Sequence, residues 1–165
     1  MPHSPVNHEI VITQDFWASP GAYPKSPWNK EGRHTGLDIR SPYDDPWFSV
    51  VPGFLHLEGT WPYLTGYGAG WGLDWGKANG GHIRFRYAHA HNRKRQYDNH
   101  HVSPGLLIGY SGATGTVRPR GKAGAHLHLE MLDYDERGRF LGWLNPRTFL
   151  EQSRIPYRHA YILKT

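Results

Sequence analysis

Residues 126–131 (His-Leu-His-Leu-Glu-Met) alternate strictly between polar and apolar side chains. Side chains of an extended strand point to opposite faces with a period of two. The segment therefore predicts a strand with a leucine and methionine face toward a core and an opposite face that carries His126, His128 and Glu130. On this segment alone, two interpretations are open: a half-buried strand with incidental histidines, and a metal or acid–base site.

Composition points to one mainly β domain. The 165-residue chain is 38% hydrophobic and 20% charged, and it is long enough to bury a core. Twenty glycines and thirteen prolines favour short strands joined by long loops. We expect an all-β fold of roughly seven to nine short strands in total, with a dominant antiparallel sheet. One short helix should begin at Asn145-Pro146, since Asn is a good cap and Pro suits the first helical position.

The expected organisation is a flexible lead-in at 1–8, a single domain at 9–152 and a C-terminal tail at 153–165 that docks or frays. No apolar run is long enough to cross a bilayer, so no membrane partner is expected. The first fifteen residues lack a basic segment followed by an apolar one, so no signal peptide is expected. Cysteine is absent, which leaves nitrogen and oxygen ligands for any metal.

The charge is unevenly distributed along the chain. Residues 1–80 hold five basic and eight acidic side chains, whereas residues 81–165 hold fourteen and six. A basic half fits an anionic partner such as a bacterial envelope, and it fits a solvated basic surface equally well. No nucleic-acid-binding motif accompanies the charge, so no nucleic-acid partner is predicted.

A second polar pair occurs in residues 34–40. In an extended backbone His34 and Asp38 share one face, while the apolar residues between them take the other. Gly36 leaves space between the two polar side chains, where a larger residue would crowd a bound ion. Taken alone, such a pair is also common on exposed surfaces.

A third histidine-bearing segment, 82–91, alternates like a strand whose apolar side ends in His89 and His91. Alternation does not distinguish between these two histidines. His56 is interpreted as a rim residue, and the pair His100-His101 as solvated. The loops at 17–32 and 59–81 are rich in glycine and aromatic residues and are suited to wall a groove. The rings in the second loop are Trp61, Tyr63, Tyr67, Trp71 and Trp75.

These residue types fit a zinc site. A catalytic zinc keeps three protein ligands and leaves the fourth position to water. His34, Asp38 and one histidine of the 126/128 pair form such a set, which predicts one zinc ion per chain. The other histidine of the pair and one from 82–91 would lie beside it, and imidazoles are suited to moving protons near neutral pH.

Four segments, in this order and spacing, resemble the M23 metallopeptidases of the lysostaphin/LytM type. They are His34-Thr35-Gly36-Leu37-Asp38, Tyr87-Ala88-His89, Gly109-Tyr110-Ser111-Gly112-Ala113-Thr114-Gly115 and His126-Leu127-His128-Leu129-Glu130. The resemblance runs from about Glu9 to Leu150. It implies a compact antiparallel β domain with loops walling a groove, and a zinc endopeptidase that cuts peptide cross-links or bridges of bacterial peptidoglycan.

The resemblance also implies a role for each candidate residue. Position by position, the zinc ligands would be His34, Asp38 and His128, and the catalytic histidines would be His89 and His126, with the general base unassigned between them. We expect a monomer that acts on the bacterial cell wall as a phage-encoded, virion-associated or mature enzyme. The bond cleaved, a glycine bridge, a D-Ala–diaminopimelate cross-link or another, stays open.

Two other functions are compatible with parts of this pattern. A catalytically inactive M23-like binding, regulatory or phage structural module would have lost ligands, whereas all five positions are occupied here. A D-Ala-D-Ala-type zinc peptidase would have a longer His-to-Asp spacing and a later Glu-x-x-His, which this sequence lacks. Glu130 either supports a ligand from behind or is simply solvated.

Overall fold

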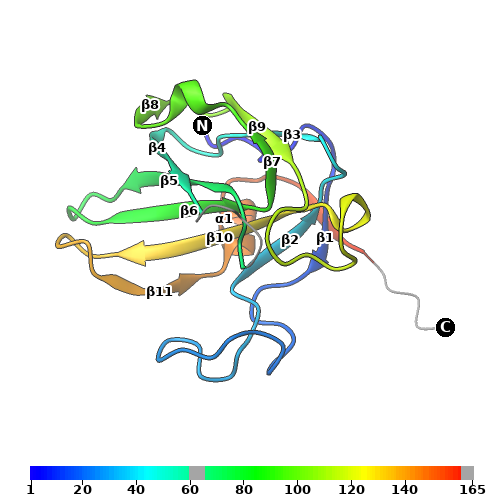
Figure 1. The fold of residues 1–165 in the computed structure, drawn as a ribbon. Helices are drawn as coiled ribbons and strands as arrows, with labels where there is room; N and C mark the ends of the chain where they lie inside the picture. The colour runs from blue at the N-terminus through cyan, green and yellow to red at the C-terminus, as the bar shows by residue number, and fades with distance from the viewer. Residues whose placement is uncertain (60–65, 161–165) are drawn as a thin grey trace.

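The computed structural model describes residues 1–59 and 66–160, which form two β-sheets and one α-helix (Figure 1). In chain order the strands and the α-helix are β1 Ile10–Gln14, β2 Gly36–Arg40, β3 Pro46–Phe48, β4 Gly53–Glu58, β5 Gly70–Gly76, β6 His82–Ala88, β7 Ala90–Arg93, β8 His100–Val102, β9 Leu107–Ser111, β10 His126–Tyr134, β11 Phe140–Leu144, α1 Pro146–Gln152 and β12 Tyr157–His159. Short 3₁₀ turns cover Arg95–Tyr97 and Lys122–Gly124. The prediction of a mainly β fold with one short helix is confirmed.

The larger sheet has nine strands in the order β12-β1-β2-β10-β6-β5-β4-β8, with β11 paired to β10 beyond the end of β2. The smaller sheet has the order β3-β9-β7. All pairings between these strands are antiparallel except that of β1 with β12, which is parallel. The dominant sheet is therefore mostly antiparallel, as expected, and mixed at one edge.

Strand β10 lies between β2 and β6 and has the two faces that its alternation predicts. Leu127 and Leu129 are fully buried in the core, and Met131 is 6% exposed. On the same side of the sheet α1 packs through Phe149, whose ring lies 4.8 Å from that of Phe85 (Figure 1). The Asn145 side chain accepts a hydrogen bond from the backbone N–H of Arg147, so the predicted helix start is confirmed.

The two ends of the chain pack against the domain. Residues 1–8 are not a free lead-in, because Val6 is 1% exposed and forms a β-bridge with Trp47 of β3. At the other end, β12 pairs with β1, and Ala160 N–H donates to the carbonyl of Ile12. The expected tail at 153–165 thus docks on the sheet edge as far as residue 160.

The single strand expected at 82–91 is interrupted at His89. His89 has φ of 70°, a conformation that residues other than glycine adopt only when the surroundings impose it. The chain then leaves the larger sheet, and β7 pairs with β9 in the smaller one. Similarly, β3 and β4, which lie on either side of Pro52-Gly53, do not pair with each other, since they belong to different sheets.

Long connections surround the polar face of β2 and β10. The segment between β1 and β2 and the segment between β9 and β10 lie on two sides of this face (Figure 1). The proposed groove residues Trp61 and Tyr63 lie outside the described residues. None of the helices in the described ranges has the length and apolar character of a membrane span.

We predict that Leu129→Ala lowers the free energy of unfolding by about 2–5 kcal/mol, because it leaves a cavity at a fully buried position of the central strand. Chemical denaturation measures the change. Leu141→Ala on β11 is the matched control, since Leu141 is 47% exposed and its loss should cost no more than about 0.5 kcal/mol. Equal effects at the two positions would contradict the assignment of β10 as the core strand.

Candidate metal centre

Three potential metal ligands converge where β2 and β10 pair. The register sets His128 of β10 opposite Asp38 of β2, and His34 lies just before β2 begins. His34 Nε2 lies 3.1 Å from Asp38 Oδ1 and 3.0 Å from His128 Nδ1, and His128 Nδ1 lies 2.9 Å from the same Asp38 oxygen. The three ligand atoms all lie within 4.8 Å of one another.

This donor set fits a divalent metal of the zinc type. Two imidazole nitrogens and one carboxylate oxygen point into a common space, which is the three-ligand pattern that leaves a coordination position open. The Nδ1–H of His34 donates to the Asp15 carbonyl at 2.9 Å, so its Nε2 is left free to coordinate. The arrangement that the spacing of His34 and Asp38 predicts is therefore present, with His128 as its third member.

The electrostatics of the cluster favour positive charge. Burial raises the pKa of Asp38, but hydrogen bonds with His128 and His34 hold that pKa well below its usual range. Burial lowers the pKa of His128, yet the hydrogen-bonded Asp38 carboxylate and the nearby Glu130 carboxylate raise it to about 9. A metal ion must displace the proton that His128 then carries, because metal ligands bind in their deprotonated form.

Two more histidines lie beside the three ligands. The His89 and His126 rings are 4.8 Å apart, and His126 Nε2 is 3.5 Å from Asp38 Oδ1. Each ring donates its Nδ1–H to a backbone carbonyl at 2.8 Å, His89 to Thr114 and His126 to Gly124. This fixes the neutral tautomer, so each Nε2 is free to accept a proton.

The structure separates His89 from His91, which alternation does not. The kink at His89 turns its side chain toward the cluster, where its ring lies 6.0 Å from that of His128. His91 is exposed and instead bonds to the Tyr43 hydroxyl at 2.6 Å. Burial, together with the charges of His126 and His128, lowers the pKa of His89 to about 3.

Glu130 is fully buried rather than solvated. Its Oε1 accepts hydrogen bonds from the hydroxyls of Tyr67, at 2.7 Å, and Thr35, and its Oε2 accepts one from Arg86 Nη1 at 2.7 Å. Burial raises the pKa of Glu130, but His128 and Arg86 more than reverse this and lower it to about 2. The sequence did not predict that Tyr67 and Arg86 bond to Glu130. Alternation in 82–91 does indicate that Arg86 lies on the polar face of its strand. Only the pairing register of β10 with β6 shows that Arg86 lies opposite Glu130.

Gly36 serves a different purpose from the one expected. A Cβ at this position would lie 2.9 Å from His128 Nε2, 3.0 Å from Glu130 Cγ and 2.5 Å from the Leu129 carbonyl oxygen. Gly36 therefore makes room for the back of His128 and for Glu130, and not for an ion between His34 and Asp38.

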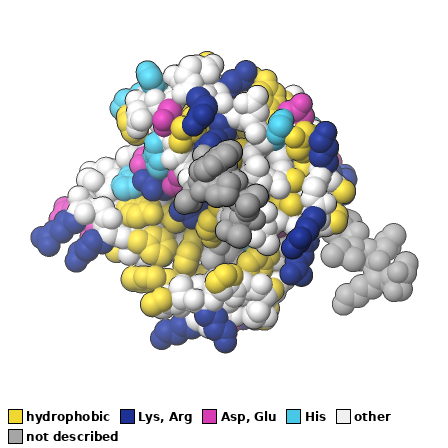
Figure 2. Space-filling view, in the orientation of Figure 1, with side chains coloured by type: hydrophobic (Ala, Val, Ile, Leu, Met, Phe, Trp, Pro, Cys, Tyr) yellow, Lys and Arg dark blue, Asp and Glu magenta, His cyan; other side chains and the backbone are white. Residues whose placement is uncertain are grey.

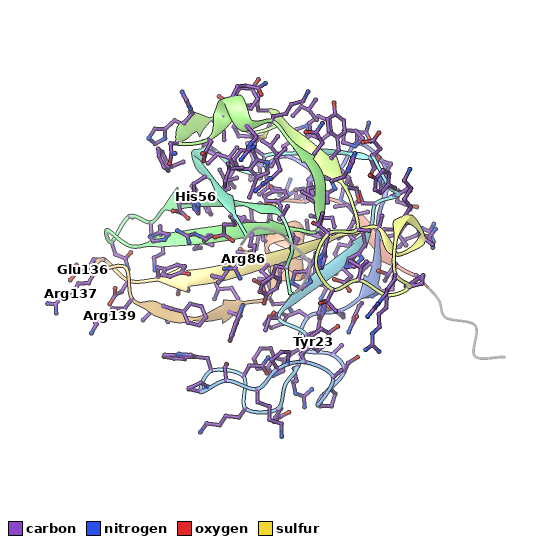
Figure 3. The ribbon with its side chains drawn as sticks, viewed as in Figure 1. Tyr23, His56, Arg86, Glu136, Arg137 and Arg139 are labelled. Carbon is purple, nitrogen blue, oxygen red and sulfur yellow. The ribbon has the colours of Figure 1, made fainter. Side chains whose placement is uncertain are left out.

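The loops and remaining histidines complete the surroundings. Tyr23, on the connection between β1 and β2, lies with its ring 5.2 Å from that of His34 (Figure 3). His56 is half-buried farther along the same sheet, with Nε2 3.5 Å from Asp74 Oδ2, and takes no part in the cluster (Figure 3). His100 and His101 are exposed on β8, as expected.

In the space-filling view, the visible Lys and Arg side chains of the described residues lie in several separate groups, most of them near the outline of the molecule (Figure 2).

Known structures share this fold. The catalytic domain of the prophage-encoded M23 protein EnpA from Enterococcus faecalis is 23% identical, with a TM-score of 0.62 over 90% of this chain and 95% of that one. The antimicrobial peptidase lysostaphin from Staphylococcus simulans is 21% identical, with a TM-score of 0.61 over 93% of this chain and 55% of that one. A zinc-containing peptidase from Vibrio cholerae is 24% identical, with a TM-score of 0.53 over 84% of this chain and 39% of that one.

The chain thus spans nearly all of the EnpA catalytic domain and about half of lysostaphin. Searches with protein-family models and among curated protein sequences return no match. The structural matches show that the chain has the fold of M23 peptidases, which confirms, at the level of fold, the resemblance that the four sequence segments indicate.

We predict that His89 in the metal-free protein stays neutral until the pH approaches about 3, since burial and neighbouring positive charge oppose its protonation. The unfolded chain protonates this residue near 6.5, so the stability that His89 contributes is complete above pH 6.5 and is lost as the pH falls toward 3. Nitrogen-15 shifts of the imidazole, followed across this range, test the prediction. A midpoint near 6.5 would contradict it.

Proposed function

We propose that this protein is a zinc-dependent endopeptidase of the M23 type that hydrolyses peptide cross-links or bridges of bacterial peptidoglycan. The observation that carries the proposal is the convergence of His34, Asp38 and His128 on a fold shared with M23 peptidases. In this proposal these three residues hold one zinc ion per chain, and His89 and His126 are the catalytic histidines.

The chemistry divides between the metal and the two histidines. When bound, zinc supplies a Lewis acid that polarises a peptide carbonyl and lowers the pKa of a water molecule. In their neutral forms His89 and His126 present Nε2 as the acceptor, because their Nδ1–H groups donate to the Thr114 and Gly124 carbonyls. One of these Nε2 atoms accepts the proton that the attacking water loses.

Once protonated at Nε2, an imidazole is a donor at both nitrogens. It then stabilises the negative charge that develops on the attacked carbonyl oxygen, or returns the proton to the leaving amine. The two rings are 4.8 Å apart, so one substrate carbonyl lies within reach of both. Which of them is the base is not assigned.

The proposed substrate is the one that the resemblance to the lysostaphin/LytM type implies. The proposed partner is the peptide moiety of bacterial peptidoglycan, with neither nucleic acid nor membrane as a partner, and the site of action is the cell wall. We propose that residues 9–152 form the catalytic unit and that the protein works as a monomer. The prophage origin of the EnpA neighbour supports a phage-encoded or virion-associated lytic enzyme.

We predict that the purified protein binds about one zinc ion per chain. His34→Ala and Asp38→Ala should abolish binding because each removes one of only three ligands. His89→Ala and His126→Ala should keep the metal and lose about 100-fold or more in activity, as expected for proton-transfer residues. Elemental analysis after zinc loading and dialysis measures the metal. Loss of zinc in His126→Ala with retention in His128→Ala would reverse the assignment of these two residues.

We further predict that the zinc-loaded protein releases new amino termini from peptidoglycan, and that the Asp38→Ala variant does not. Digesting walls with glycine bridges and walls with direct D-Ala–diaminopimelate cross-links, followed by mass spectrometry of the fragments, identifies the bond. Absence of cleavage in every wall type by a folded, zinc-loaded protein would favour the inactive binding module instead.

A further inference from the structure

Only one of the two ring nitrogens of His128 faces the proposed metal site. Its Nδ1 faces Asp38 Oδ1 and His34 Nε2, at 2.9 and 3.0 Å. Its Nε2 points to the opposite side, is buried, and has no well-aligned hydrogen-bond partner among the described residues. A carboxylate oxygen, Glu130 Oε1, lies 3.4 Å from this nitrogen. The ring is therefore placed between a group of ligands and a second carboxylate.

The Glu130 carboxylate is held rigidly in this position. No part of the residue is exposed, and the hydroxyls of Tyr67 and Thr35 and the guanidinium of Arg86 all donate to it. A buried carboxylate without partners would be strongly destabilising. Arg86 supplies the opposite charge and is itself bonded through Nε to Glu58 Oε2 at 2.5 Å. Arg86 is thus paired with two carboxylates, Glu130 and Glu58.

The surroundings leave Glu130 no other role at the metal. The imidazole of His128 lies between Glu130 and the other two ligands, since Glu130 approaches Nε2 and they approach Nδ1. Gly36 allows His128 and Glu130 to approach each other here, because a Cβ at this position would be too close to both side chains. Tyr67 also packs on His128, with ring centroids 5.5 Å apart, so the ring is confined on its face as well.

We propose that Glu130 is the positioning residue for His128: its carboxylate accepts the Nε2–H and so presents Nδ1 to the metal. Metal-bound histidines commonly donate their second N–H to a carboxylate or carbonyl, which fixes the tautomer and ring orientation. This inference rests on the proposed metal site and adds a residue that orients one of its ligands. Glu130 touches neither substrate nor the reacting atoms in this account, and it acts through His128 alone.

The first test is zinc affinity, measured by competition with a chromophoric chelator. Glu130→Gln keeps the size and one oxygen acceptor but removes the charge, and we expect zinc binding to weaken about 10- to 100-fold. The matched control is Asp133→Asn on the same strand, where the carboxylate pairs with Lys77 Nζ at 2.7 Å, away from the site. The control should bind zinc as the unaltered protein does. A folded Glu130→Gln variant with unchanged zinc affinity would overturn the proposal.

The second test needs no variant. In unaltered protein loaded with ¹¹³Cd, scalar coupling to imidazole nitrogens identifies the coordinating atom of each histidine. We expect coupling to His128 Nδ1 and a proton on His128 Nε2. Coupling to Nε2 would overturn the proposal, even if Glu130→Gln does not fold.

The two proposals fail separately. A protein that binds zinc through His128 Nδ1, loses affinity in Glu130→Gln, and cleaves no peptidoglycan keeps the positioning role and loses the proposed activity. If the protein cleaves peptidoglycan but Glu130→Gln retains full zinc affinity, the proposed activity stands and the positioning role of Glu130 is rejected.

Discussion

The register between β10 and β2 is the constraint on which the candidate site depends. It sets His128 opposite Asp38 and Glu130 opposite Gly36. A slip of one residue would reverse the faces of β10, moving the two histidines into the core and its leucines toward solvent. The fully buried Leu127 and Leu129 oppose such a slip, so packing on one face of the sheet secures the ligand geometry on the other.

The polar face of this sheet carries buried charge, and the structure compensates for it locally. Asp38 lies among histidines, Glu130 is bonded to Arg86, and Arg86 is bonded to Glu58. Removing one member of such a set leaves its partner buried and uncompensated, so we expect substitutions at these positions to be destabilising. In our proposal the same network orients the metal ligand, so folding stability and zinc binding depend on shared residues.

Part of this arrangement was predictable from sequence. Alternation predicted the two faces of β10 and the shared face of His34 and Asp38, and the Asn-Pro pair predicted the helix start at Asn145. Each of these features depends on near neighbours in the chain. Alternation does not reveal which strands pair. The salt bridge between Glu130 and Arg86 joins β10 to β6, and the parallel pairing of β12 with β1 joins the two ends of the chain.

The position of His89 shows the same limit. Its positive φ depends on contacts with a distant loop, since the N–H of His89 bonds to the carbonyl of Tyr67 and that of Ala90 to the carbonyl of Ala69. Periodicity assumes a regular backbone and fails where tertiary contacts break it. The resemblance of four ordered segments to a known family did select His89, because that comparison draws on a whole fold.

A crystal structure of the zinc-loaded protein, with anomalous scattering recorded at the zinc edge, tests the central claim most directly. Our account predicts one anomalous peak per chain, at about 2.0–2.2 Å from His34 Nε2, Asp38 Oδ1 and His128 Nδ1. A peak at another cluster, such as His56 and Asp74, or bonded to His128 through Nε2, would contradict it.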